Sequence, residues 1–262
     1  MTMQEILAAV RRGDLTEAEA ETRIMALLYE RGEDFLLDLH REKRIGFPEV
    51  VYAAGKSVPQ LLAIAAAILE EKGTVFVSGL DHEREAALRG RFPDRILRQA
   101  GRVLVIRADA AAPAPAPLGT VGLVTAGTSD IPYARECGLI LSEMGAEVVE
   151  AFDAGAAGMH RPELGLRKVR HADVLIVFAG MEGVLPPLIA SLTPQPVIAV
   201  PTPIGYGHGG LGEGALCTML QTCVPGVLVV NIGNAVGAAA GAVRILKAMR
   251  KGGADDRVGP TS

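Results

Sequence analysis

The chain has 262 residues, a formal net charge of −4 and a hydrophobic fraction of 49%. This length suits about two domains with a sizeable core, and the mild negative charge argues against a nucleic-acid partner. The N-terminal segment MTMQEILAAVRRGDL lacks the apolar region of a signal peptide, and no apolar run reaches the ~20 residues of a membrane span. We therefore expect a cytoplasmic protein without a membrane partner. Its three cysteines lack metal-ligand spacing and fit reduced thiols.

Residues 1–108 predict a small α/β domain. Thr16 and Glu19 have the spacing of a capping box at the start of a helix over 16–31. Further helices are expected over 3–12, 58–71 and 82–91, and strands over 49–53, 74–79 and 102–107. The alternating alanines and prolines of 109–117 favour polyproline II, which predicts a semi-rigid linker.

Residues 118–262 repeat a strand-then-helix pattern. Strands are expected over 120–125, 147–152, 173–178, 197–200 and 227–232, with helices in the gaps and a last helix over 235–249. Crossovers of this length force parallel pairing and place helices on both faces of the sheet. The sequence therefore predicts an α/β fold, with a three-layer αβα, Rossmann-like second domain.

Four Gly-rich or polar turns follow these strands: VTAGTSD (124–130), AGMHRPE (157–163), FAGMEGVLP (178–186) and VPTPIGYGHGG (200–210). In parallel sheets, ligands bind in the crevice beyond the carboxyl ends of the strands. The four turns therefore predict one shared site.

The first turn is Gly127-Thr128-Ser129-Asp130. A glycine after a strand permits positive φ, and two hydroxyls beside the free amides of a helix N-terminus suit a phosphate. Alternatively, Ser129 or Asp130 only caps a helix that starts near Ile131-Pro132. Both can hold together, because a capped N-terminus stays electropositive.

Two other turns carry candidate acid–base groups. His160 stands beside Arg161, and a neutral imidazole next to a guanidinium suits proton transfer near an anion, although a histidine in a loop is often only solvated. Glu182 follows a very apolar strand, so partial shielding from water would suit a general base. The structural alternative is that Glu182 only interacts with the first amides of the next helix.

The remaining candidates are a glycine-rich loop and a cysteine. Residues 205–210, GYGHGG, predict either a lid over a ligand or a disordered surface loop. Cys137 and Cys217 lie within predicted helices and are expected to be inert core residues. Cys223 is expected at the end of a helix over 211–222, where a thiolate would need an activating cation.

These motifs together resemble two related families over almost the whole chain. GTSD, AGMHR, AGMEGVLP and VPT resemble the carboxyaminoimidazole ribonucleotide mutases of purine synthesis. The segment HREKRIGFPEVVY (40–52), with GTSDIP, AGMEG, GYG and a cysteine before VVNI, is more similar to the nickel-pincer-nucleotide biosynthesis carboxylases. The chain departs from that family's pattern at Thr222, His208 and Gly233, which bears on metal binding and substrate contacts.

The resemblance implies that the enzyme carboxylates the pyridinium ring of nicotinic acid adenine dinucleotide with CO2 or bicarbonate and releases AMP. It implies Cys223 as the nucleophile, Glu182 as the base that removes the ring proton, and His160 as an assisting group. Mg²⁺ is implied for hydrolysis of the phosphoanhydride, with no ligands identified, and no organic cofactor. The expected substrate-binding residues are Gly127, Thr128, Ser129, Asp130, Arg161, Gly180, Met181, Gly183, Gly205, Tyr206, Gly207 and Asn231.

Two alternatives stay open, a ribonucleotide mutase of purine synthesis and a non-catalytic nucleotide-binding module. The C-terminal helix contains the run Ala238–Ala242, AAAGA, which permits close approach of another backbone. Because the related mutases form octamers, the resemblance implies a homo-oligomer, expected to be an octamer.

Overall fold

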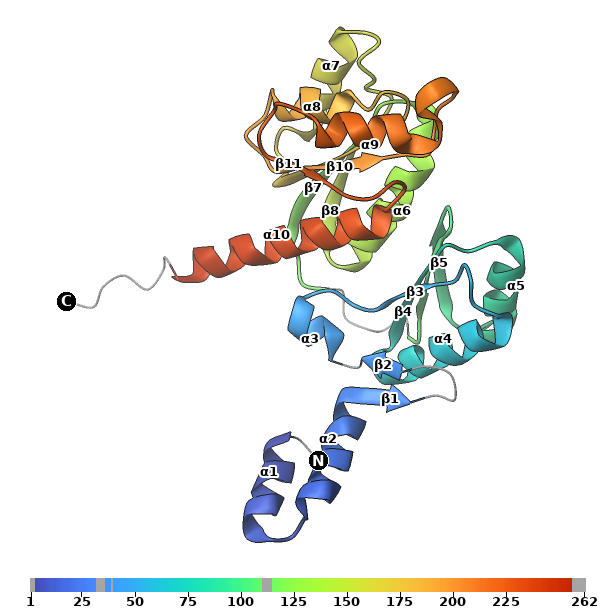
Figure 1. The fold of residues 1–262 in the computed structure, drawn as a ribbon, viewed down its shortest axis with the longest axis vertical. Coiled ribbons are helices and arrows are strands. Elements are labelled where there is room, and N and C mark those ends of the chain that lie inside the picture. The colour runs from blue at the N-terminus through green and yellow to red at the C-terminus, as the bar shows by residue number, and fades with distance from the viewer. Residues whose placement is uncertain (1–2, 32–35, 39, 110–114, 256–262) are drawn as a thin grey trace, which may run out of the picture. The chain divides into compact units, whose positions relative to one another are not determined.

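Figure 1 shows the computed structural model, which describes residues 3–31, 36–38, 40–109 and 115–255. The chain divides into two compact units, one formed by 1–97 with 104–110 and the other by 98–103 with 111–262. Residues 110–114 of the predicted linker lie outside the described residues. Each unit has a hydrophobic core of its own.

The first unit begins with a helical pair, α1 (Met3–Arg12) and α2 (Glu17–Leu28). The predicted capping box is confirmed, since the N–H of Thr16 donates to Glu19 Oε2 at 2.8 Å and the N–H of Glu19 donates to Thr16 Oγ1 at 3.2 Å. Helix α2 ends earlier than predicted, because the chain turns into β1 (Tyr29–Arg31), which pairs antiparallel with β2 (Leu36–Asp38).

A four-stranded sheet of order β3-β4-β6-β5 belongs largely to the first unit. Its strands are β3 (Val50–Tyr52), β4 (Thr74–Ser78), β5 (Ile96–Ala100) and β6 (Val103–Arg107), and its helices are α4 (Val58–Lys72) and α5 (His82–Arg91). The sequence predicts an apolar stripe on α4, and its members Leu61, Ile64, Ala65 and Ile68 are buried, whereas Leu62 is only partly buried. The sequence did not predict β5, whose segment ILRQA is only partly buried and has no clear alternation.

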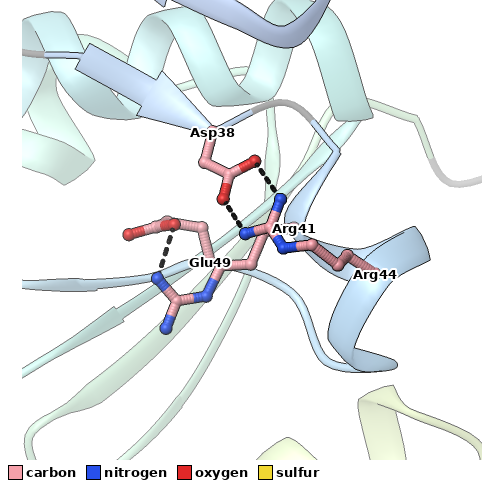
Figure 2. Close-up of polar contacts among 4 residues, drawn as sticks. All are labelled: Asp38, Arg41, Arg44 and Glu49. Carbon is pink, nitrogen blue, oxygen red and sulfur yellow. Dashed lines mark hydrogen bonds and ion pairs between the residues drawn. The ribbon is translucent and has the colours of Figure 1, made fainter.

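Figure 2 shows how the arginines of the segment 40–52 are used. Both lie on the short helix α3 (Arg41–Ile45). Arg44 donates to both carboxylate oxygens of Asp38, at 3.2 Å to Oδ1, and this guanidinium holds the pKa of Asp38 below its usual value. Arg41 donates to Glu49 at 3.1 Å, just before β3. The two arginines therefore attach α3 to the strands on either side of it in the chain.

The second unit contains a fully parallel sheet of order β11-β10-β9-β7-β8. Its strands are β7 (Gly119–Thr125), β8 (Ala146–Ala151), β9 (Val174–Ala179), β10 (Val197–Pro201) and β11 (Val227–Val229). All five were predicted, and every residue of β9 and β10 is buried, as expected for strands covered on both faces.

Helices cover both faces of this sheet, which confirms the three-layer αβα prediction (Figure 1). One layer contains α6 (Ile131–Glu143) and α10 (Ala235–Asp255). The other contains α7 (His160–Val169), α8 (Leu185–Ala190) and α9 (Glu213–Leu220), whose apolar side chains share one core cluster. Strand order reverses between β7 and β9, which makes their carboxyl ends the switch point of the sheet.

The small residues of α10 have a role inside the chain. Ala238, Ala239 and Ala242 are fully buried in the single chain, where α10 packs on α6, β9 and β10. Close approach of these elements accounts for the small side chains. The alanine run therefore does not by itself indicate an oligomer, and the oligomer stays a prediction.

Candidate active site

A cavity of about 270 Å³ lies at the switch point, beyond the carboxyl ends of β7, β8 and β9. The loops after these three strands supply most of its wall, and Ile204 from the loop after β10 completes it. Seven predicted site residues line this cavity: Gly127, Ser129, Asp130, Arg161, Gly180, Met181 and Glu182. The predicted convergence of the turns on one site is therefore met for these seven residues.

Asp130 ties the loop after β7 to the loop after β10. It lies in the short 3₁₀ turn Thr128–Asp130 and is 3% exposed. Its carboxylate accepts the N–H of Gly127 at 2.8 Å and the hydroxyl of Thr202 at 2.6 Å. Burial raises the pKa of Asp130, and these hydrogen bonds oppose the rise. Asp130 does not cap α6 with its side chain, so the simple capping alternative is wrong for this residue.

The loop after β8 contributes an ion pair that sequence reasoning missed. Asp153 has φ +59, and its N–H donates to Thr125 Oγ1 at 3.0 Å. Its carboxylate accepts from Arg161, and both residues line the cavity. The sequence feature that could have pointed to Asp153 is its place two residues after the end of β8, at the predicted ligand edge. His160, by contrast, is exposed at the start of α7 and is not among the lining residues.

The loop after β9 is held tightly against the loop after β10. Met181 has φ +50, and its N–H donates to the carbonyl of Ile204 at 2.7 Å. A Cβ at Gly180 would overlap the same carbonyl oxygen, so only glycine fits there without a shift. Glu182 lines the cavity but is exposed in the single chain. The expected shielding of Glu182 from water is therefore not provided by the single chain.

Several other predicted residues lie at the carboxyl edge without lining the cavity. Thr128 and Gly183 belong to the same loops as lining residues. Tyr206, in the GYG loop before the 3₁₀ segment Gly207–Gly212, is 82% exposed. Asn231 is exposed after β11, and its side-chain oxygen accepts the N–H of Ile232. The predicted residues not brought to the cavity are Thr128, His160, Gly183, Gly205, Tyr206, Gly207, Cys223 and Asn231.

Cys223 lies at the opposite edge of the sheet. It precedes β11, whose first residue, Val227, pairs with Val197 at the start of β10. Glu182 follows β9, whose last residue, Ala179, pairs with Pro201 at the end of β10. At ~3.3 Å per residue, the four steps from Val197 to Pro201 alone separate the two edges by roughly 13 Å. The single chain therefore does not bring Cys223 and Glu182 together, contrary to the prediction of a single shared site.

The cysteine environments also differ from the predictions. Helix α9 ends at Leu220, so Cys223 stands in the following turn rather than at the helix end. Cys137 is buried in α6, as predicted, and burial raises its pKa. Cys217 is exposed on α9, and the core prediction for it was wrong. The physical reason is that α9 turns only one narrow side toward the sheet, where Ala215 and Met219 are buried.

The described residues offer no metal cluster. Nowhere among them do three or more His, Cys, Asp or Glu side chains gather in a way that could hold an ion. In the cavity, Asp130 and Asp153 already accept hydrogen bonds from Thr202 and Arg161. These residues do not fit a resident Mg²⁺ site. The same described residues contain no helix long and apolar enough to span a bilayer.

Comparison with known proteins identifies the family. A model described as LarB/PurE-like N-terminal domain matches residues 29–109, and one described as AIR carboxylase matches residues 120–256. MJ0165, an uncharacterized protein of Methanocaldococcus jannaschii, is 37% identical over 259 residues, which are 95% of this chain and 98% of that protein. The chain belongs to the LarB-type branch of the AIR carboxylase family.

Mutases resemble only part of this LarB-type chain. The N5-carboxyaminoimidazole ribonucleotide mutase of M. jannaschii is 37% identical over 114 residues, 42% of this chain and 67% of the mutase. The mutase of Saccharolobus solfataricus is 34% identical over 132 residues, 48% of this chain and 80% of the mutase. The chain is thus an enzyme of the LarB/PurE type, as the motifs indicated.

Proposed function

We propose that this LarB-type enzyme carboxylates the pyridinium ring of nicotinic acid adenine dinucleotide and hydrolyses its phosphoanhydride. The products are pyridinium-3,5-biscarboxylic acid mononucleotide and AMP, in the first step of nickel-pincer cofactor synthesis. The observation that carries the proposal is the cavity at the switch point, where Ser129, Arg161 and Glu182 meet. The LarB-type N-terminal match over 29–109 favours this reaction over that of a mutase.

The cavity wall suits a phosphorylated ligand with a reacting ring. The hydroxyl of Ser129 and the amides of the loop after β7 can donate to phosphate oxygens, as can the free N–H groups of Arg161. Glu182 also lines the cavity, on the loop after β9. A carboxylate there can take a proton from a ring carbon held between the loops.

The proposed chemistry begins with a thiolate, because a pyridinium ring is too electron-poor to attack CO2. Addition of Cys223 Sγ forms an S–C bond and moves an electron pair to the ring nitrogen, giving an enamine-like dihydropyridine. The enamine carbon attacks CO2, Glu182 removes the proton from that carbon, and the S–C bond breaks to restore the aromatic ring. Thiolate is suited to both addition and departure. His160 would assist the carboxylate or a proton.

The opposite-edge positions of Cys223 and Glu182 require a second copy of the chain in this scheme. We propose a homo-oligomer, as an octamer, in which one subunit supplies Glu182 and another supplies Cys223. Cys223 is exposed and so is Glu182, so both are accessible to another subunit. Exposed apolar side chains near the two groups, including Leu220, Leu228 and Val184, would be covered by such contacts.

We propose Mg²⁺ as a cofactor that, when bound, would neutralise charge on the phosphoanhydride oxygens. Because the described residues do not form a cluster for it, we assign no step to the metal. Water supplies the oxygen that cleaves the anhydride and releases AMP.

One assay tests the proposal. The purified full chain is incubated with nicotinic acid adenine dinucleotide and ¹³C-bicarbonate, and mass spectrometry follows AMP and a labelled carboxyl on the mononucleotide. Both products are expected. In parallel, N5-carboxyaminoimidazole ribonucleotide is supplied, because the two mutases are 37% and 34% identical to this chain over 114 and 132 residues. Conversion of that compound alone supports the mutase alternative, and turnover of neither compound supports a non-catalytic module.

A further inference from the structure

The turn after β8 holds Asp153 in an uncommon backbone conformation. Its φ of +59 lies in the left-handed region, which Asp tolerates better than most residues but at a cost. Thr125, fully buried at the end of β7, accepts the N–H of Asp153 at 3.0 Å, and its carbonyl accepts the N–H of Ala154 at 2.8 Å. The end of β7 therefore fixes the position of Asp153 at the cavity wall.

Arg161 is the partner of Asp153 before any ligand arrives. It lies in the first turn of α7, eight residues further along the chain, and its Nη2 donates to Asp153 Oδ2. Neither side chain is buried, with 42% of Asp153 and 38% of Arg161 exposed. Because the contact uses one of the five guanidinium N–H groups, the others can still face a ligand anion. The pair thus presents adjacent negative and positive groups to the cavity.

The charges on the cavity wall are unbalanced. Among its lining residues, carboxyl groups come from Asp130, Asp153 and Glu182, and the one guanidinium comes from Arg161. Even when Asp130 is protonated, which its burial favours, two carboxylates face one cation. A ligand with anionic groups only would meet a repulsive wall away from Arg161. A ligand that joins a phosphate to a cationic ring matches both signs.

We propose that Asp153 is a specificity-determining residue that selects a positively charged pyridinium ring over an uncharged ring of the same shape. This inference rests on the proposed function, which places a pyridine nucleotide in the cavity. Phosphate engages Arg161, and the carboxylate of Asp153 then faces the ring cation. The same carboxylate disfavours reduced pyridine nucleotides, whose dihydropyridine ring carries no charge.

The test compares nicotinamide mononucleotide with its reduced form, which differ by one hydride and one ring charge. Isothermal titration calorimetry measures both dissociation constants for the full-length wild type, Asp153→Asn and Glu150→Gln. The wild type is expected to prefer the oxidised form by roughly tenfold or more, and Asp153→Asn to lose most of that preference. Glu150 is an exposed acid on β8 outside the cavity lining, so Glu150→Gln is expected to keep it.

The ratio of the two affinities separates selection from a structural role. The amide of Asp153→Asn would keep a carbonyl oxygen that can accept from Arg161, so a residue that only positions Arg161 would change both affinities alike. Equal binding of the two forms by the wild type, an undiminished preference in Asp153→Asn, or binding of neither form overturns the inference. Turnover of nicotinic acid adenine dinucleotide is measured on the same preparations. If one of these three outcomes is found while turnover is present, the proposed function stands and only the role of Asp153 is rejected.

Discussion

The hydroxyl of Thr202 donates a 2.6 Å hydrogen bond to Oδ1 of Asp130, and both residues are buried. This bond joins the loop after β7 to the loop after β10, across β9. Asp130 also lines the cavity, so this hydrogen bond connects the cavity wall to the loop after β10. Such a buried carboxyl group makes stability depend on pH.

We expect the free energy of unfolding to report the ionisation of Asp130. Its pKa is raised above the ordinary value of 3.8, so its contribution to stability is fully present below 3.8 and is lost as pH rises through the raised folded-state pKa. The substitution Asp130→Asn removes this pH-dependent contribution. Urea denaturation of the wild type and the variant, from below pH 3.8 to above the raised pKa, measures the difference between their free energies of unfolding. A wild-type advantage that grows, rather than shrinks, as the pH rises contradicts the assignment.

Gly180→Ala is expected to weaken ligand binding and to lower the free energy of unfolding by roughly 1–3 kcal/mol, because the added Cβ overlaps the carbonyl oxygen of Ile204. The loop after β9 must then move away from the loop after β10. The matched control is Gly90→Ala, on α5, where an added Cβ meets nothing within 4 Å. Chemical denaturation measures the stability of both variants, and titration with nicotinamide mononucleotide measures their ligand binding. Equal stability of the two variants would show that the loops are not packed as described.

Glu182→Gln is expected to lower turnover by about 10²–10⁴-fold while substrate binding persists, since the amide cannot accept the ring proton. Glu213→Gln is the control, because Glu213 is an exposed acid at the start of α9 and does not line the cavity. Single-turnover mass spectrometry measures the carboxylated product. A near-normal rate for Glu182→Gln removes this residue from the mechanism.

Cys223→Ser is expected to abolish ring carboxylation with nucleotide binding retained, because a hydroxyl neither adds to the ring readily nor leaves it. Cys217→Ser provides the control, since Cys217 is equally an exposed thiol, and Cys137→Ser should be close to neutral for activity. The measurement is ¹³C incorporation into the mononucleotide. Carboxylation by Cys223→Ser at a comparable rate rules out the covalent adduct.

If each active site takes Glu182 from one subunit and Cys223 from another, which we call a composite site, two inactive variants should complement each other. When Glu182→Gln and Cys223→Ser subunits are mixed, dissociated and reassembled in equal amounts, about a quarter of the sites regain both groups if each site draws them from different subunits. Light scattering on the same samples should show an oligomer. A monomer with full activity at micromolar concentration, or an oligomer whose mixed form stays inactive, contradicts the composite site.

The strands of the second unit, and the turns that follow them, could be predicted from the amino-acid sequence. Continuous β-branched runs such as VLIVFA mark buried parallel strands, and strand–helix alternation requires the turns after β7, β8 and β9 to share one edge. The capping box of Thr16 and Glu19 is equally local, since both partners lie within one turn. The element order also implies the amino-edge position of Cys223, which lies between a helix and the next strand.

Which loops come into contact could not be predicted from the sequence, because it depends on the three-dimensional fold. The reversal of strand order places β9 beside β7, so Glu182 and Ser129 share a cavity, while Tyr206 and Asn231 lie beyond its wall. The Asp153–Arg161 pair and the Asp130–Thr202 bond depend on how separate loops fold toward one another. Strand order and loop contacts are long-range properties, whereas sequence patterns report the periodicity of neighbouring residues. For that reason the sequence predicted that the site lies at the carboxyl edge of the sheet, but not which residues line its cavity.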